Sequence, residues 1–127
     1  MSHILRLLRV CDLSDDTEGY RVLVERQWPG GFRKEKLQLD LWAKDVAPSP
    51  ELFKRFRHDK ERFGEYVSLY YTELDANTAA KALACELNAV IENQDVLLLY
   101  TGRSANFDPA LILMEWLMSQ MKGKSYD

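Results

Sequence analysis

The chain has 127 residues, of which 46% are hydrophobic and 29% are charged, a balance typical of a single soluble globular domain that buries its own core. Its formal net charge of −3 argues against broad electrostatic binding to nucleic acid or to acidic membranes, so neither is expected as a partner.

The cysteine and histidine content predicts neither a disulfide nor a metal site. Cys11 and Cys85 lie far apart in the sequence, so we expect free thiols in a reducing compartment, with the cytoplasm as the location. The two cysteines, taken together with His3 near the terminus, do not have the spacing of zinc ligands. No metal or other cofactor is therefore expected. The N-terminal segment 4–10 is interrupted by Arg6 and is too short for a signal peptide or a membrane span.

Two strands are predicted in the first part of the chain. Residues 4–10 alternate weakly between apolar residues and arginines and indicate a first strand. Residues 12–19 are acidic and turn-forming, which indicates a solvated loop; a cation site is the less favoured alternative, because the glycine-centred spacing of a calcium-binding hand is missing. Residues 20–27 form a second predicted strand, which Pro29 and the next two glycines end, so that it opens into a shaped loop.

The segment after this loop contains four charges and then an alternating pattern. Residues 33–36 are a solvated turn or face a ligand, and the sequence leaves both alternatives open. Leucines alternate with mostly polar residues over 37–44, which predicts a short strand or an extended segment.

Three helices are predicted to follow. The first begins at Pro50, with Ser49 as its N-cap, and ends near His58. Asp59 is expected to cap the second, whose aromatic residues recur at helical spacing and therefore belong to the core. Asn77 is expected to cap the third.

The last two predicted elements are strongly apolar. Residues 96–100, VLLLY, show no alternation, which is typical of a parallel strand covered on both faces. Asp108 and Pro109 then start a helix that is apolar nearly all round, so it is either buried on two sides or part of a subunit interface.

This order of elements predicts an α/β fold, a single layered domain over residues 1–127 with a small, mostly parallel, Rossmann-like sheet flanked by helices. In such sheets ligands bind beyond the carboxyl ends of the strands, where loops 28–36 and 101–108 are expected to meet. Arginines, the start of the last helix and an aromatic wall would together favour a small anionic ligand. The predicted ligand-binding residues are Arg26, Trp28, Arg33, Lys34, Tyr100, Arg103 and Ser104.

A purely structural explanation of the same residues is equally open. An arginine at a strand end often pairs with a carboxylate, and a Trp-Pro turn often only closes a core. Catalytic patterns are weak, because the chain lacks both a cysteine-phosphatase loop and a nucleotide-phosphate loop. His58 beside Asp59 is the best acid–base candidate, with a surface or capping histidine as the alternative; Lys44 is the second catalytic candidate.

Several segments resemble the YeaO-like family of uncharacterised bacterial proteins. They are ERQWPGG at 25–31, DLWAKDVAPS at 40–49 and the pair His58-Asp59, and the similarity extends over roughly residues 6–117. The resemblance implies a small cytoplasmic α/β domain without an established reaction.

The chain departs from the pattern of the family at two places. Glu25, Gln27 and Gly30 stand where the family usually has an aspartate, a leucine and a second arginine. After the buried strand, Ser104, Phe107 and Asp108 stand where the family tends to have an acidic residue and a His-Asn pair. The resemblance therefore implies an altered ligand or none.

Two functional hypotheses follow from the sequence. The first is a crevice for a small anionic ligand, with or without catalysis. The second is a non-enzymatic binding or regulatory module that forms a homodimer through its apolar last helix. Nucleic-acid binding through the lysines and arginines of 33–44 is disfavoured by the acidic balance.

Overall fold

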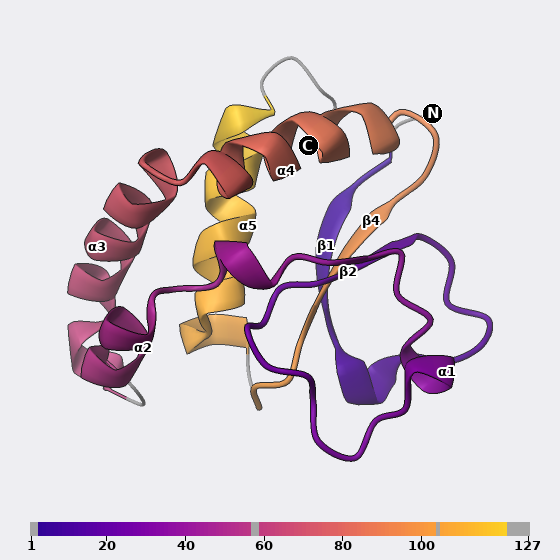
Figure 1. The fold of residues 1–127 in the computed structure, drawn as a ribbon, viewed down its shortest axis with the longest axis horizontal. Helices are drawn as coiled ribbons and strands as arrows, with labels where there is room; N and C mark the ends of the chain where they lie inside the picture. Colours follow the sequence, from indigo (N-terminus) through magenta and orange to yellow (C-terminus); the bar gives the residue numbers. More distant parts are fainter. Residues whose placement is uncertain (1–2, 57–58, 104, 122–127) are drawn as a thin grey trace.

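Four parallel strands form one sheet in the computed structural model, in the order β1-β4-β2-β3 (Figure 1). The structure describes residues 3–56, 59–103 and 105–121. The strands are β1 Leu5–Arg9, β2 Tyr20–Leu23, β3 Leu41–Trp42 and β4 Val96–Tyr100. The predicted α/β fold with a small parallel sheet is confirmed, and every strand pair in the described part of the chain is parallel.

The central position of β4 confirms the interpretation of VLLLY as a buried strand. It pairs with β1 on one side, where Arg9 lies opposite Tyr100, and with β2 on the other. All five of its residues are buried, because both faces of the sheet are covered at this strand.

Five helices surround the sheet (Figure 1). They are α1 Lys34–Leu37, α2 Pro50–Phe56, α3 Phe63–Asp75, α4 Thr78–Val90 and α5 Pro109–Gln120. Short 3-10 turns occupy Val10–Asp12, Lys44–Val46, Lys60–Arg62 and Ala105–Phe107. None of the described helices has the length and apolar character needed to cross a bilayer.

Three of the four predicted helix starts are confirmed by their caps. Ser49 Oγ accepts a hydrogen bond from the backbone N–H of Leu52 at the start of α2, at 3.1 Å. Asn77 caps α4 and Asp108 caps α5 in the same manner. The prediction for Asp59 is wrong, because its side chain makes no capping hydrogen bond and a 3-10 turn separates it from α3.

The larger core lies between the sheet and helices α2 to α5. Val22, Leu98 and Tyr100 face these helices from the sheet. Helix α5 contacts both α3 and β1, and its Trp116 is only 1% exposed and donates its indole N–H to Asp75. The packing within this chain therefore accounts for the apolar sequence of α5.

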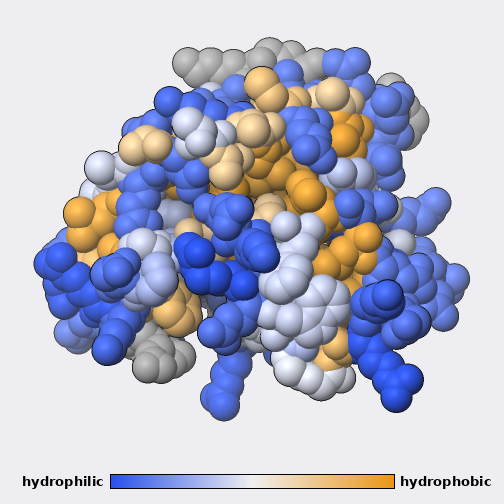
Figure 2. Space-filling view, viewed as in Figure 1, coloured by the Kyte–Doolittle hydropathy of each residue, from blue (hydrophilic) through white to orange (hydrophobic). Residues whose placement is uncertain are grey.

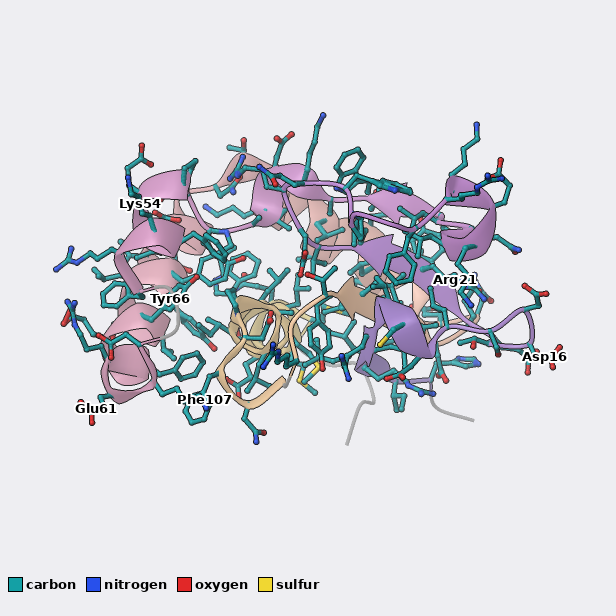
Figure 3. All side chains as sticks on the ribbon, turned by 90° about the horizontal axis from the view of Figure 1, so that it is seen from below. Asp16, Arg21, Lys54, Glu61, Tyr66 and Phe107 are labelled. Carbon is teal, nitrogen blue, oxygen red and sulfur yellow. The ribbon has the colours of Figure 1, made fainter. Side chains whose placement is uncertain are left out.

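The opposite face of the sheet is covered by loops and by α1 instead of long helices. Leu23, Leu97 and Leu99 point to this side and pack against Leu13 and Leu37. Arg21 of β2 is 5% exposed here, and Figure 3 shows it beside α1. Its guanidinium donates to the carbonyl oxygens of Leu37, Ser14 and Thr17 at 2.9, 2.9 and 3.0 Å. The loops before and after β2 are thus attached to the same side chain.

Two predicted strands are shorter in the structure than in the sequence pattern. The strand predicted over 20–27 ends at Leu23, and the segment 37–44 contains only the two-residue strand β3. For the segment 37–44, the reason is that residues 34–37 form a helical turn, which buries Leu37 and ends at Gln38 in a left-handed conformation (φ 45°). Packing of Leu37 under the sheet thus takes precedence over the alternation of leucines.

We predict that Arg21→Met lowers the free energy of unfolding by about 3 kcal/mol, because three carbonyl oxygens lose their buried donor. Urea unfolding measures the change. The matched control, Arg6→Met on an exposed position of β1, should change stability by less than about 0.5 kcal/mol. Equal effects of the two variants would contradict the structural role assigned to Arg21.

Candidate functional site

A pocket of about 350 Å³ lies at the carboxyl edge of the sheet, where the chain leaves β1, β2 and β4. This edge is at the bottom of Figure 1, and Figure 3 views it from below. The pocket is lined by residues 9–11 after β1, by Glu25, residues 27–30 and Phe32 after β2, and by Thr101 after β4. The predicted location of a site at this edge agrees with the general rule for parallel sheets.

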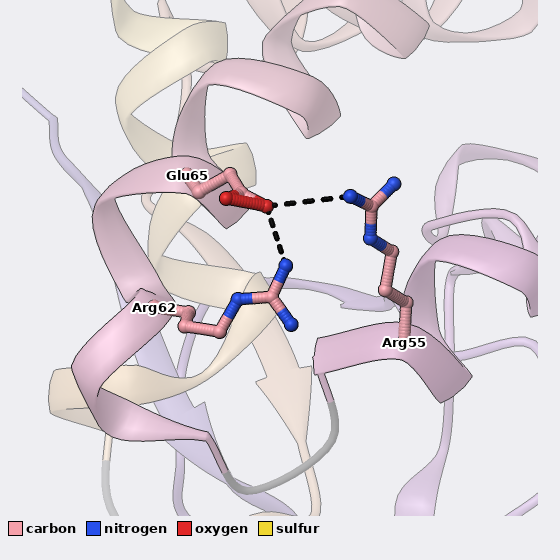
Figure 4. A network of polar contacts seen from close by, with 3 residues as sticks. All are labelled: Arg55, Arg62 and Glu65. Carbon is pink, nitrogen blue, oxygen red and sulfur yellow. Dashed lines mark hydrogen bonds and ion pairs between the residues drawn. The ribbon is translucent and has the colours of Figure 1, made fainter.

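The cationic residue of the pocket lining is Arg9. It is the last residue of β1 and is half-buried, and its Nε is buried without a hydrogen-bond partner. Within the described ranges, ion pairs at 4.0 Å or less join Glu65 to Arg55 and to Arg62 (Figure 4), and no carboxylate comes this close to Arg9. Arg9 is in register with Tyr100, so its side chain leaves the sheet on the helix-covered face at the carboxyl edge.

Glu25 provides a negative charge at the same pocket and is held in place by β4. One carboxylate oxygen accepts from the backbone N–H of Thr101 at 2.8 Å, and the other accepts from its hydroxyl at 2.7 Å. The backbone carbonyl of Glu25 accepts from the indole N–H of Trp42 at 2.7 Å. These contacts fix both the chain and the carboxylate where β2 and β4 end.

Trp28 forms an aromatic wall of the pocket. Its indole N–H donates to the carbonyl oxygen of Phe32 at 2.7 Å, which closes the Trp-Pro-Gly-Gly loop. The ring also packs edge-on against Trp42, with 5.4 Å between ring centroids. Since the N–H is already bonded, the surface that Trp28 offers to a ligand is apolar.

Of the other predicted ligand-binding residues, those that the structure describes do not line this pocket. Arg26 donates to the carbonyl oxygens of Ala47 and Pro48, both at 3.2 Å, and so holds the loop before α2. Tyr100 is buried on the helix-covered face, and burial raises its pKa. Three more of the predicted ligand-binding residues are exposed and do not line the pocket, namely Arg33, Lys34 and Arg103. Ser104 lies outside the described residues.

The two catalytic candidates also lack a described place in the pocket. His58 lies outside the described residues. Lys44 is exposed, with its ammonium 5.2 Å from the centre of the Trp42 ring. Among the residues that the structure describes, no group of three potential metal ligands is found.

Sequence reasoning missed Arg9, Glu25 and Thr101 as pocket residues. The available signal for Arg9 and Glu25 is a charge at the end of an apolar strand, the same signal that had suggested Arg26. Cys11 also lines the pocket, so this residue lies at the carboxyl edge.

The start of α5 is occupied by a carboxyl group of the chain itself. Asp108 accepts from the backbone N–H of Ala110 at 2.9 Å. Burial raises the pKa of Asp108 to about 6, against the opposing effect of this hydrogen bond, and the charge of Glu25 raises it further. Gly102 lies so close that an added Cβ would collide with the Asp108 carboxylate. The buried hydroxyl of Tyr66 has no hydrogen-bond partner, and its pKa is raised by burial and then by Asp108.

We predict that the free energy of unfolding falls as pH rises, because Asp108 then loses its proton in the folded state. Because its folded-state pKa of about 6 exceeds the ordinary value of 3.8, the folded state retains a proton that the unfolded state has lost. The stabilisation is complete below about pH 4 and is lost as pH rises through 6. Asp108→Asn keeps the capping oxygen, so it should be more stable than the unmodified protein at pH 7 by up to about 3 kcal/mol and equally stable at pH 4.

Thermal unfolding of both proteins between pH 4 and pH 8 measures this difference. Asp16→Asn, in the exposed loop seen at the right of Figure 3, controls for the loss of one negative charge. A constant difference between Asp108→Asn and the unmodified protein across the range would contradict the shifted pKa.

Comparison with known proteins identifies the family. Residues 4–127 match the family described as the inactive DUF488-N3 subclade. The uncharacterised protein YeaO of Escherichia coli is 36% identical over 112 residues, which cover 87% of this chain and 94% of YeaO. Uncharacterised proteins of Mycobacterium bovis and Mycobacterium tuberculosis are 44% identical over 79 residues, 62% of this chain and 67% of each relative. No solved structure gives a significant match.

These matches confirm the resemblance that the Trp-Pro-Gly-Gly and Ala-Pro-Ser segments suggested. The chain belongs to the YeaO-like proteins, within the inactive DUF488-N3 subclade.

Proposed function

We propose that this protein binds a small molecule with an anionic group at the carboxyl edge of its sheet and catalyses no reaction there. The observation that supports this proposal is Arg9, which lines the pocket at the end of β1 and has no carboxylate within 4.0 Å among the described residues. An anionic ligand would give this unpaired charge a partner.

The chemistry of arginine favours a carboxylate or a phosphate as the anionic group. The planar guanidinium offers parallel N–H donors that match two oxygens of such a group. The half-buried position of Arg9 reduces competition from water, which strengthens the contact. Trp28 and Phe32 would cover the apolar part of the ligand.

Binding without catalysis agrees with two further observations. Both carboxylate oxygens of Glu25 already accept hydrogen bonds from Thr101, which leaves this group poorly placed to act as a general base. The subclade itself is described as inactive. A cytoplasmic location stays a prediction, supported by the free thiols of Cys11 and Cys85.

Homodimerisation through α5 is the second candidate function and has less support. The large apolar side chains of α5 are buried in the core of the chain, which leaves half-buried residues such as Leu111 and Met114 for a partner. On the face seen in Figure 2, polar residues frame separate apolar areas. The exposed large apolar side chains belong to different segments: Ile4, Trp42, Phe53 and Phe107. Sedimentation equilibrium would detect a dimer.

We predict that a ligand in this pocket slows the reaction of Cys11 with the thiol reagent DTNB. Cys11 lines the pocket and both cysteines are exposed, so the variant Cys85→Ser leaves one reporting thiol. The protein is first screened by thermal shift against small carboxylates, amino acids and phosphorylated metabolites; a ligand at about a hundred times its Kd adds roughly 2.7 kcal/mol of stability. The ligands found are then titrated in the DTNB assay.

Arg9→Gln in the Cys85→Ser background should weaken the protection of Cys11 by roughly tenfold to a hundredfold, because a charge-assisted hydrogen bond contributes about 1.5–3 kcal/mol. The control Arg103→Gln, at an exposed residue outside the pocket lining, should leave it unchanged. The proposal is wrong if no anionic compound protects Cys11, or if both variants have the same effect.

A further inference from the structure

We propose that two copies of this chain pair through the outer edge of β1 and form a homodimer with one continuous sheet. In this dimer the two β1 strands run antiparallel about a two-fold axis at Leu7, and the two α5 helices lie next to each other on one side of the joined sheet. The inference does not depend on the ligand of the proposed function. It differs from a dimer held by α5 alone, because backbone hydrogen bonds of β1 form its centre.

The first observation is that β1 is a long sheet edge whose outer backbone groups can pair. The strand order places β1 and β3 at the two edges, and β3 has only two residues whereas β1 has five. The backbone N–H of Val96 in β4 donates to the carbonyl oxygen of Ile4 at 3.0 Å, so alternate residues of β1, beginning with Ile4, bond to β4. The N–H and C=O groups of Leu5, Leu7 and Arg9 therefore point outward, and within the described ranges no other backbone group bonds to them. Such an edge is a template for another strand.

The second observation is that β1 is complementary to itself when two copies run antiparallel. With Leu7 at the two-fold axis, the two Leu7 residues form one hydrogen-bonded pair, and Leu5 of each copy forms another with Arg9 of the other copy. Arg6 lies opposite Leu8, so no two like charges face each other directly. A pairing centred on Arg6 would bring the two Arg6 side chains together, and one centred on Leu8 would leave Leu5 without a strand residue opposite. The sequence of β1 thus favours one register.

The third observation is an apolar strip on the side of α5 that faces the same edge. Helix α5 lies between α3 and β1 and contacts both (Figure 1). Trp116 points to α3, since its indole N–H donates to Asp75 at 2.9 Å. At about 100° per residue, Leu111 and Met114 lie roughly 140° and 160° around the helix from Trp116. Both are half-buried, and they lie on the side of α5 away from α3, toward the outer edge of β1.

A second copy is the partner that fits the strand edge and the apolar strip at once. In an antiparallel pair related by a two-fold axis, opposite side chains leave the joined sheet on the same face. The helix-covered faces of the two copies are then continuous, and Leu111 and Met114 of one α5 approach those of the other. Leu7 packs on this face as well, so one contact would cover all three half-buried side chains. The closed pairing also removes the free sheet edge.

Amide hydrogen exchange, measured by NMR at several protein concentrations, tests the edge directly. The N–H groups of Leu5, Leu7 and Arg9 should exchange at least roughly tenfold more slowly in the dimer than in the monomer obtained by dilution, because only the dimer gives them acceptors. The N–H groups of Arg6 and Leu8 bond to β4 in both states, so they are the internal control. Sedimentation equilibrium gives the Kd of the dimer and the state present at each concentration.

A charge at the two-fold axis should weaken the dimer. Leu7→Lys should raise its Kd at least roughly tenfold, because two like charges would face each other directly. The matched control is Phe53→Lys, which replaces an exposed large apolar residue of α2 and should leave the Kd unchanged.

A pair of introduced cysteines tests the register. In a background with Cys11→Ser and Cys85→Ser, the double variant Arg6→Cys, Leu8→Cys should form a disulfide-linked dimer on mild oxidation, because residues 6 and 8 lie opposite each other in the proposed pairing. Arg6→Cys alone is the control. It should crosslink far less, because the two copies of residue 6 are then roughly 8 Å apart, beyond the reach of a disulfide.

The outcomes decide the inference without involving the ligand. A protein that stays monomeric up to about 1 mM would overturn it. A dimer in which Leu5, Leu7 and Arg9 exchange as fast as in the monomer would have its interface elsewhere, which also overturns the inference, and protection without the disulfide between residues 6 and 8 would overturn the register. If Leu7→Lys fails to fold, amide exchange and the cysteine pair decide alone. The proposed ligand site is tested separately, by the protection of Cys11.

Discussion

The buried guanidinium of Arg21 is the contact on which the shape of this molecule most depends. The helix-covered face of the sheet has a large apolar core, but the other face is closed by two loops and a single helical turn. Arg21 donates to the carbonyl oxygens of Leu37, Ser14 and Thr17 and so connects both loops to β2. Because buried carbonyl oxygens need hydrogen-bond donors, the Arg21 guanidinium stabilises the loops that cover this face in place of long helices.

This arrangement also determines where a ligand can approach. On the helix-covered side, the start of α5 is blocked by Asp108, and Arg26 is bonded to the loop before α2. On the loop-covered side, Trp28 and Phe32 leave the carboxyl edge accessible. The charged residues that line the pocket at this edge are Arg9, the last residue of β1, and Glu25, which follows β2.

Membership of the YeaO-like proteins gives the divergence at Gly30 a structural meaning. Gly30 lines the pocket, and a Cβ built on it would meet no atom within 4 Å. The second arginine that the family pattern has at this place would therefore extend into open space at the pocket.

The sequence by itself determined the elements that depend on local chemistry. It indicated the caps Ser49, Asn77 and Asp108, because capping needs only a few neighbouring residues, and the buried strand β4, because continuous apolar residues have no solvated face. Only the tertiary structure decided which charged residues meet at the pocket. Glu25 and Arg26 are adjacent and point to opposite sides of β2, both sides are apolar, and nothing local distinguishes them. The contact of Arg9 with the same pocket requires β1 and β2 to flank β4, and that order is set by long-range packing.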